Sequence, residues 1–396
     1  QAYQRRRRPR WSPPPRRARA PGGRRAGSAR PAEPSAPTAD RLHITLHDGP
    51  TAPDDVAERL TDLRLARRAE REPGDPPRPR RALVGSLRGP RAPGEIVRWA
   101  LAEVDGEAVG LGEWEIEGND NPQLGWIDVF VVPAWRGRGV GRAIARAVTE
   151  DAAAHGATEV GFGVAGHIDV GRQLIAHVEG AWGERCRLVE RMSRLALASL
   201  DRDAIRAQSA ARWARLADRY RPLFFEGVDF PAADARFNLA DFFDMSTEID
   251  NLMPLEDLSM APEHWTPERW AAVVASEHAQ GMVVWNVVAQ RLSDGRLVGL
   301  SNVSFDPAEP WKVIQWATGV RKSEQGQGLG KALKLWMLVK LFDEVPGAAV
   351  VDTGNAVSND AMIGINTDLG FEEHFREHCY QVDLGRWRAI LAGRSA

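Results

Sequence analysis

Hydrophobic and polar positions alternate along this chain in an arrangement that occurs twice. Residues 96–116 read as two short strands around an Asp-Gly pair at 105–106, and residues 283–305 repeat this around an Asp-Gly pair at 294–295. Asp-Gly between two such runs favours a tight hairpin turn. Each hairpin precedes a mostly apolar strand, a glycine-rich loop and a helical pattern. The sequence therefore predicts the same order of elements in both halves.

The rest of the pattern extends this correspondence. It predicts further strands at residues 41–49, 127–132, 158–164, 190–197, 222–228, 313–320, 348–354 and 375–384. It predicts helices at residues 52–71, 141–156, 238–251, 267–278, 330–346 and 359–368, and a short helical segment between the strands at 158–164 and 190–197. A Pro- and Arg-rich segment at 73–93 is expected to be a loop. We expect an α+β fold in each half, with a mixed, mostly antiparallel central sheet flanked by helices.

Matching positions in the two halves lie at a nearly constant separation. Arg136 matches Gln325, 189 residues later, and Gly183 matches Gly370, 187 residues later. A period of this length indicates a duplicated domain rather than a solenoid. The 396 residues suffice for two ordinary domains. We expect a disordered tail at 1–42, an N-terminal domain at 43–199, a connecting helix at 200–220 and a C-terminal domain at 221–396.

The predicted tail differs from the rest of the chain in charge. Residues 1–42 hold twelve arginines against Glu33 and Asp40, a net charge of +10, whereas the whole chain has −2. The segment is rich in Pro, Gly and Ser and has too little apolar surface to order itself. It is either a tail for nucleic acid or another anionic surface, or an unstructured extension. We favour the extension and expect no nucleic-acid partner.

Several classes of protein are not favoured by the sequence. No apolar run is long enough to span a membrane, and no apolar region of a secretory signal follows the basic N-terminal segment. Cys186 and Cys379 lack metal-ligand spacing, and a reducing cytoplasm is the simpler interpretation. His374 and His378 fall on a predicted strand, where the i, i+4 spacing does not suit a zinc site. We expect a cytoplasmic protein without membrane partner or metal.

The repeated loops have the chemistry of an anion site. They read RGRGVG at 136–141 and QGQGLGK at 325–331, each between a predicted strand and a predicted helix. The first N–H groups of a helix have no backbone partner, and the helix dipole adds positive potential there. Glycines let the backbone approach the anion closely, so a pyrophosphate is the expected ligand.

Two common pyrophosphate motifs do not fit. The nucleoside-triphosphate loop needs Ser or Thr after Gly-Lys and a Gly at its start, but Ala332 follows Lys331, and Gln325 stands at the first position. The dinucleotide fingerprint needs G-x-x-G spacing after a parallel strand, but both loops read G-x-G-x-G after hairpins.

Both loops instead match [QR]-x-x-G-x-[GA], the motif of the GCN5-related N-acetyltransferase (GNAT) superfamily. Arg136, Gly139 and Gly141 fit it in the first copy, and Gln325, Gly328 and Gly330 fit it in the second. The P-x-x-R-G frame at 133–137 and the N-x-x-M-x-x-x-N-x-x-L-G-F run at 359–371 strengthen the match. Over about residues 43–390 the chain resembles two-domain actinobacterial acetyltransferases of the mycothiol-synthase type.

This resemblance implies acetyl-coenzyme A as co-substrate, without a metal. Its pyrophosphate would bind the loop amides, and its pantetheine would lie along the preceding strand. The implied coenzyme-binding residues of the second copy are Val320, Gln325, Gly326, Gln327, Gly328, Leu329, Gly330, Lys331, Asn355 and Asn359. Those of the first copy are Val131, Arg136, Gly137, Arg138, Gly139, Val140, Gly141 and Arg142.

The resemblance also implies how the reaction would proceed. A backbone N–H near Val131 or Val320 would polarise the thioester carbonyl. A neutral amine of a small molecule would attack directly, without a covalent enzyme intermediate, so positioning would supply much of the rate. The family places one asparagine after the next strand and another at the start of the next helix. Asn355 and Asn359 fit in the second copy, whereas the first copy has none and its second motif is degenerate. We therefore expect the C-terminal half to be catalytic.

The candidate proton-transfer groups depart from the family pattern. Many members have a tyrosine general acid at a position occupied here by Asn366 and, in the first copy, by Glu179. An amide has no useful pKa for this role, so Asn366 either takes part otherwise or packs locally. Asp128 could act as a general base or be a structural carboxylate. Our candidate catalytic residues are Val320, Asn366 and Asp128.

Other residues and functions remain open at this stage. Tyr380 and Cys379 could border the acceptor pocket or pack, and Asp241, Asp244 and Glu248 could meet a cationic amine or face solvent. The chain could also be a non-catalytic acyl-coenzyme A sensor or scaffold. We expect either a monomer with internal pseudo-duplication or a homodimer.

Overall fold

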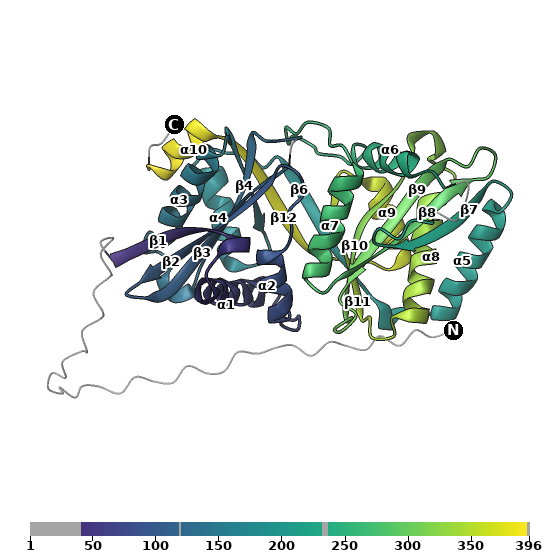
Figure 1. Cartoon of the computed structure of the whole chain (residues 1–396), viewed down its shortest axis with the longest axis horizontal. Coiled ribbons are helices and arrows are strands. Elements are labelled where there is room, and N and C mark those ends of the chain that lie inside the picture. Colours follow the sequence, from purple (N-terminus) through teal and green to yellow (C-terminus); the bar gives the residue numbers. More distant parts are fainter. Residues whose placement is uncertain (1–40, 119, 232–236, 394–396) are drawn as a thin grey trace, which may run out of the picture. The chain divides into compact units, whose positions relative to one another are not determined.

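The structure is a computed structural model that describes residues 41–393 except 119 and 232–236 (Figure 1). The described residues belong to one compact unit. The prediction of a disordered tail lies, up to residue 40, outside the described residues. No helix in the described part of the chain is long and apolar enough to cross a bilayer.

The first half follows the predicted order, with one helix more. Its elements are β1 (Leu42–Asp48), α1 (Asp54–Arg71), α2 (Arg80–Arg88), β2 (Glu95–Val104), β3 (Glu107–Glu117), β4 (Leu124–Val131), α3 (Val140–Ala154), β5 (Glu159–Ala165), α4 (Asp169–Gly180) and β6 (Leu188–Ala196). The loop predicted at 73–93 was wrong where it covers α2. That helix forms because Ala82, Leu83 and Leu87 are buried, so tertiary packing outweighs the Pro and Arg content around it.

The second half repeats the order. Its elements are α5 (Arg202–Leu216), β7 (Tyr220–Glu226), α6 (Leu239–Asp250), α7 (Pro267–Ala279), β8 (Val283–Arg291), β9 (Leu297–Phe305), β10 (Lys312–Val320), α8 (Leu329–Glu344), β11 (Val350–Ala356), α9 (Asp360–Leu369), β12 (Glu372–Asp383) and α10 (Leu384–Leu391). Both predicted hairpins are present, as β2–β3 and β8–β9. In the first, Asp105 and Gly106 both have positive φ, 54° and 83°, as a type I′ turn requires.

The strands form one twelve-stranded sheet with a palindromic order. The order is β1-β2-β3-β4-β5-β12-β6-β11-β10-β9-β8-β7. If β1 is equated with β7, β2 with β8 and so on to β6 with β12, it reads the same from either end. Only β4–β5 and β10–β11 pair in parallel, so the expected mixed, mostly antiparallel α+β fold is confirmed, with a pseudo-two-fold relation between the copies.

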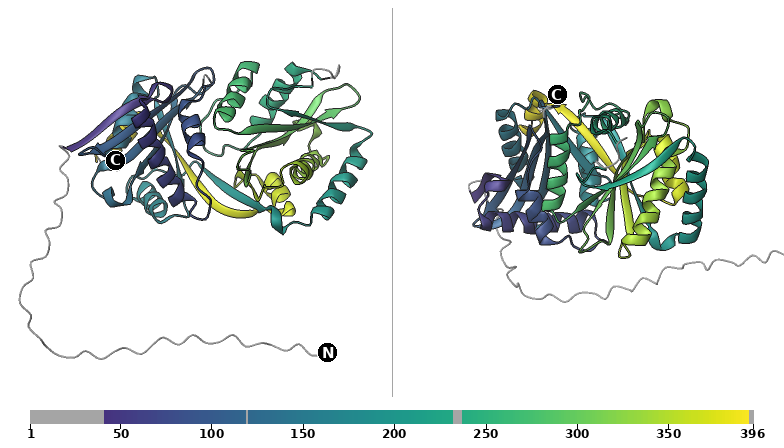
Figure 2. Two further views of the ribbon diagram at one scale, coloured as in Figure 1. Left: turned by 60° about the horizontal axis from the view of Figure 1, so that its bottom comes forward. Right: turned by 45° about the vertical axis from the view of Figure 1, so that its right-hand side comes forward.

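The two copies exchange their last strands at the centre of this sheet. β12 pairs with β5 of the first copy, and β6 pairs with β11 of the second. Figures 1 and 2 show these two strands crossing between the halves. The following helices go the same way: α5 contacts α8, and α10 contacts α3. The two domains that we propose from the sequence are therefore interlocked, and the segment expected as a connecting helix contributes Ile205 and Leu216 to the core around α8.

Helices cover both faces of the sheet in each half. In the second copy, α8 and α5 bury one face through residues such as Leu333 and Leu338. On the other face, α6 and α7 bury Phe242 and Trp270 against the strands. The first copy has α3 on one face and α1 with α2 on the other. This arrangement fixes the strand that enters each glycine loop and the helix that leaves it.

Candidate active site

The two glycine loops present unsatisfied backbone N–H groups. Gly137 and Gly139 have φ of 73° and 84°, and Gly326 and Gly328 have 76° and 80°. Only glycine adopts these angles readily. No side chain caps the start of α3 or α8, so their first amides are available to an anion. Both loops thus have the backbone geometry expected for a pyrophosphate.

Beside each loop, two parallel strands pair over only three residues. β4 pairs with β5 at Leu124–Trp126, and β10 pairs with β11 at Lys312–Ile314. Beyond these residues the strands no longer bond to each other. A gap between β4 and β5, or between β10 and β11, therefore leads from the paired residues towards the loop.

One backbone amide in each copy faces this gap. The N–H of Arg321 donates to the carbonyl of Val298 on the β9 side at 2.9 Å, and the N–H of Val132 donates to that of Val109 on the β3 side at 3.0 Å. Successive amides of a strand point to opposite edges. The N–H groups of Val320 and Val131 therefore point to the open edge. This is the orientation needed to polarise a carbonyl that lies in the gap.

The strand before the loop is bulged only in the second copy. β10 shifts its register against β9 between Gln315 and Thr318, where it holds one extra residue. β4 keeps a continuous register against β3 from Trp126 to Val131. A bulge bends the strand and redirects its groups. The second copy thus has a distorted strand where the first has a regular one.

A chain of three polar side chains lies beside the gap of the second copy. Nζ of Lys334 on α8 donates to Oδ1 of Asn366 at 2.7 Å, and Nδ2 of Asn366 donates to Oδ1 of Asn355 on β11 at 2.8 Å. The protonated lysine can only donate, so it fixes which end of each amide faces which neighbour. The NH₂ group of Asn355 remains for a further acceptor, and no hydrogen bond from it occurs within the described residues.

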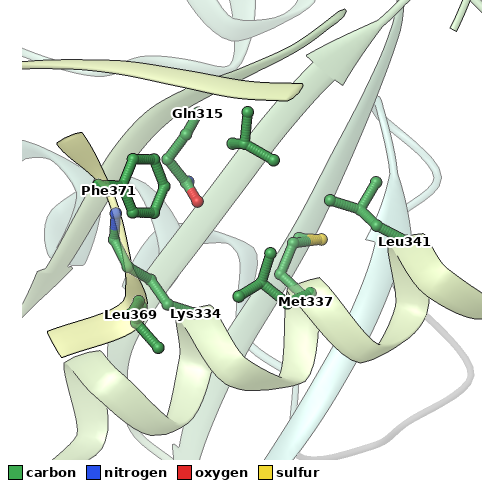
Figure 3. Close-up of a pocket in the computed structure, with 8 residues that line it drawn as sticks. Gln315, Lys334, Met337, Leu341, Leu369 and Phe371 are labelled. Atoms are coloured by element: carbon green, nitrogen blue, oxygen red, sulfur yellow. The ribbon is translucent and has the colours of Figure 1, made fainter. Parts of the chain in front are cut away.

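Lys334 is an unusual residue for the interior of an α/β layer. It is 2% exposed and lies over the ring of Phe371, with Nζ 5.1 Å from the ring centre. Figure 3 shows its side chain next to Phe371 and Gln315 around a cavity of about 10 Å³. Burial without a carboxylate partner lowers its pKa from the ordinary 10.5 to about 7. The fold therefore holds this amine close to its point of deprotonation.

The two asparagines expected to meet the coenzyme have different roles in the structure. Asn355 is partly buried at the end of β11. Asn359 caps α9, where its Oδ1 accepts from the N–H of Met362 at 3.2 Å. Asn366 is 3% exposed, and both ends of its amide are bonded. Asn366 thus positions Asn355 rather than facing open space.

The first copy has no equivalent of this polar chain. Counted from the loops and from the strand register, Ala145, Glu179 and Val164 stand where the second copy has Lys334, Asn366 and Asn355. Glu179 accepts a hydrogen bond from the hydroxyl of Tyr380 at 3.0 Å. The phenol belongs to β12, so the strand exchange satisfies this carboxylate from the other copy. Tyr380 is fully buried, which makes it a packing residue, and this burial raises the pKa of its phenol.

The charged candidates of the first copy are already paired. Nε of Arg136 donates to the carbonyl of Val131 at 2.9 Å, and its guanidinium forms a bidentate ion pair with Glu70. Asp128 accepts from Arg67 of α1 at 2.6 Å. In the second copy, Gln325 replaces Arg136 and is exposed. The first copy therefore directs its loop arginine and Asp128 towards α1.

The acidic side chains of α6 pair with an arginine at the start of the second loop, and Asp244 is also exposed to solvent. Asp241, Asp244 and Glu248 surround the guanidinium of Arg321, which is 4% exposed. Arg321 also donates from Nε to the carbonyl of Leu297 at 2.8 Å. These acids hold the residue at which β10 becomes the loop, a role that the sequence did not predict. Asp244 still faces solvent, whereas Asp241 and Glu248 are partly buried.

Two arginines near the second loop were not predicted. Arg212 of α5 lies beside Gly328, since a Cβ on that glycine would stand 3.3 Å from its Nη1. Arg219 donates to Oε1 of Gln327 at 2.9 Å. Lys331 is paired with Asp368 at 3.2 Å. The strand exchange, which the local sequence does not reveal, brings α5 to this loop and so adds positive charge there.

The histidines and cysteines do not form a metal centre. Within residues 41–393, apart from the gaps at 119 and 232–236, no three His, Cys, Asp or Glu side chains are grouped as metal ligands. Cys379 is buried and Cys186 partly buried, and both are free thiols.

Comparison with known proteins agrees with this geometry. The sequence model of the Acetyltransferase (GNAT) family matches residues 60–167, which include β4, its loop and α3. The match falls on the first copy, where the loop sequence is RGRGVG.

Solved structures of similar fold span most of the chain. A tandem GNAT protein from the clavulanic acid biosynthesis pathway has a TM-score of 0.66 at 22% identity, covering 87% of this chain and 99% of its own. A GCN5-related N-acetyltransferase from Sphaerobacter thermophilus has a TM-score of 0.56 at 16% identity, covering 87% and 96%. The glucosamine N-acetyltransferase region of a fungal multi-domain β-N-acetylglucosaminidase has 0.58 at 15%, covering 86% and 38%.

The solved structures show that both copies have a tandem GNAT fold. The match of residues 60–167 to the Acetyltransferase (GNAT) family supports an acyltransferase.

Proposed function

We propose that the protein is an N-acetyltransferase that moves the acetyl group of acetyl-coenzyme A to a primary amine of a small molecule, with the C-terminal copy as the working site. The observation that carries this proposal is the gap between β10 and β11. The N–H of Val320 faces this gap, and the open loop at 326–328 lies at its end. A thioester there would have a polarising donor at its carbonyl and amides at its pyrophosphate.

The side chains around this gap support the choice of the C-terminal copy. The free NH₂ group of Asn355, fixed through Asn366 and Lys334, is a directed donor for an amide carbonyl of the pantetheine arm. Arg212 adds positive charge beside Gly328. The first copy has Val164 and a paired Arg136 instead, so we propose that it serves mainly as a structural partner.

The proposed reaction is direct transfer. The neutral amine attacks the thioester carbonyl carbon, the C–N bond forms, and the C–S bond breaks as the electron pair leaves with sulfur. The amine nitrogen loses one proton and the thiolate can take one, so the products are an amide and free coenzyme A. The Val320 N–H would stabilise the oxyanion between these steps.

The test is turnover with purified protein, acetyl-coenzyme A and a panel of primary amines. Thiol release and the acetylated product, identified by mass spectrometry, are expected together in equal amounts. A matched reaction without any amine gives the rate of simple thioester hydrolysis. If acetyl-coenzyme A binds but no amine in a broad panel is acetylated, the sensor or scaffold alternative replaces the enzyme. If it does not bind, both fail.

A further inference from the structure

A cavity of about 360 Å³ lies apart from the glycine loops, between the two copies. Its walls come from α7, β9 and β10 of the second copy and from the α1–α2 segment of the first. A volume of this size is within the range of small-molecule sites. The cavity takes in Ile314 and Trp316 of β10, the last residue paired with β11 and a residue of the bulge. It therefore adjoins the place where the proposed acetyl group would arrive.

Most of the charged residues around this cavity are neutralised within the protein. Arg68 pairs with Glu72, and Lys312 pairs with Glu72 and Asp75. Asp306 and Glu309 pair with Arg81.

Two opposite charges remain. Among the described residues, Arg78 from the first copy and Glu277 on α7 are in no ion pair, although both line the cavity.

A hydrogen-bonded wall connects these two groups without joining them. Nη2 of Arg78 donates to Oε1 of Gln280 at 2.6 Å, and Nε2 of Gln280 donates to Oε1 of Glu277 at 3.4 Å. One amide side chain thus separates the guanidinium from the carboxylate. The charges are close enough for one small ligand to reach both and too far apart to satisfy each other.

Further hydrogen bonds connect Glu277, at the acidic end of this wall, to the bulge of β10. Ser304 hydrogen-bonds to Glu277, and Nε1 of Trp316 donates to Oγ of Ser304 at 2.8 Å. Trp316 is 52% exposed, the largest exposed fraction of any large hydrophobic residue in the described part of the chain. Trp311, Met282 and Ile314 add apolar surface. The wall thus offers a carboxylate next to aromatic faces, a suitable setting for an organic cation.

The electrostatics favour a ligand that brings both charges. Burial raises the pKa of Glu277 and lowers the pKa of Arg78, because each lies in a poorly solvated place. A buried charge is stabilised when an opposite charge joins it. An ammonium beside Glu277 and a carboxylate beside Arg78 would supply both missing partners together.

We propose that this cavity binds the acceptor, and that the acceptor is a zwitterion, a primary amine carrying a carboxylate a few bonds away. Glu277 contacts the ammonium and takes from it the proton that it must lose before the neutral amine attacks, Arg78 contacts the carboxylate, and Trp311 and Trp316 cover the carbon chain between them. This deepens the proposed function and rests on it for the transfer itself, but the binding of a zwitterion can be measured without turnover.

The experiment uses a series of ω-amino acids, from glycine to 6-aminohexanoate, against n-alkylamines and alkyl carboxylates of the same length. Binding is read by saturation-transfer NMR on the full chain, and turnover by thiol release with acetyl-coenzyme A. We expect one chain length to bind at least tenfold more tightly than its matched amine and carboxylate. The variants are Arg78→Gln and Glu277→Gln, with Arg80→Gln, which lies outside the cavity wall, as control.

Arg78→Gln is expected to lower the preference for zwitterion over amine at least tenfold. Glu277→Gln is expected to lower the preference for zwitterion over carboxylate at least tenfold. Arg80→Gln should change neither preference. Equal binding of zwitterion and amine to the wild type, or preferences unchanged in both variants, would overturn the proposal. A calorimetric titration with acetyl-coenzyme A runs beside it. If the coenzyme fails to bind while the zwitterion preference behaves as expected, the proposed function fails and the pocket stands.

Discussion

The loop before α3 and the loop before α8 have nearly the same glycine dihedral angles, but their neighbouring side chains differ. In the first copy, Arg136 is held by Glu70 and by the carbonyl of Val131. In the second, Gln325 is exposed, β10 is bulged, and Asn355 presents a fixed amide to the strand gap. Both copies therefore have the backbone geometry of an anion site, but only the second has polar side chains oriented towards the strand gap.

This difference separates two roles of the loop motif, forming the turn from strand to helix and binding a ligand. The glycines and the helix start are needed for the fold to turn from strand to helix, so they persist whether or not a ligand binds. Orienting groups such as Asn355 have no comparable structural task. The family match nevertheless covers residues 60–167, in the first copy. A family match at a loop is thus weaker evidence for a working site than the groups around the loop.

The largest effect that separates the copies should come from Lys334, because the first copy has Ala145 at this place. With a pKa of about 7 when folded and 10.5 when unfolded, Lys334 is protonated more fully in the unfolded chain between these values. The free energy of unfolding should therefore rise with pH from about 7 to 10, by up to about 1.4 kcal/mol per unit from this group. Below pH 7 both states are protonated, and its destabilising contribution is complete.

Urea unfolding at pH 7, 8 and 9 measures this. Lys334→Met should be more stable than the wild type at pH 7, and the difference should shrink as pH rises. Lys322→Met, at an exposed lysine, is the control and should keep a constant difference. A constant difference for Lys334→Met as well would mean that the buried amine has an ordinary pKa.

An exchange of side chains between the copies should alter coenzyme binding in one direction only. Asn355→Val gives the second copy the residue of the first, and acetyl-coenzyme A should bind about tenfold more weakly, the loss of roughly one directed hydrogen bond. The reverse change, Val164→Asn, should leave the dissociation constant within twofold. Calorimetry on both variants decides. An equal loss in both would show that the two gaps contribute alike.

Releasing Arg136 should affect stability rather than binding. Arg136→Gln removes the bidentate pair with Glu70, whose side chains are both 29% exposed. Such a partly solvated pair contributes about 1 kcal/mol at most. We expect a slightly lower melting temperature and an unchanged affinity for acetyl-coenzyme A. A large loss of affinity would instead place the coenzyme at the first loop.

The smallest predicted effect concerns the helix that strand exchange brings to the second loop. Arg212→Gln should weaken acetyl-coenzyme A binding about threefold at low salt and less at high salt, because the charge acts across partly solvated space. Arg215→Gln on the exposed side of the same helix should change binding less. If both variants behave alike, Arg212 acts only through the net charge of α5.

Much of this fold could be predicted from the sequence, and the reasons are local. The Asp-Gly turns, the alternating strands and the glycine loops each depend on residues close in the chain, and the two copies confirm one another. Helix α2 was missed because only its burial against the sheet stabilises it. The exchange of β6 and β12 was missed because an apolar strand does not indicate which neighbour it will pair with.

In the candidate site, too, only the residues that belong to a local motif could be predicted from the sequence. The loops and Asn355 follow from a motif, and their placement beside the strand gap is consistent with it. Lys334 has the spacing of an ordinary helix residue, and Arg212 belongs to a segment expected only to connect the domains. Arg78 and Glu277 are about 200 residues apart and meet only through the packing of the two copies. Such sites arise from tertiary contacts that no local pattern contains.

The central claim is that one of two similar loops holds the coenzyme, and a matched pair of variants tests it most directly. Gly328→Glu and Gly139→Glu each place a carboxylate where a pyrophosphate would bind, at φ values of 80° and 84° that strain both substitutions alike. Calorimetry with acetyl-coenzyme A should show one site in the wild type, no measurable binding in Gly328→Glu, and affinity within threefold of wild type in Gly139→Glu. Loss of binding in Gly139→Glu, or two sites of which each variant removes one, would contradict the account.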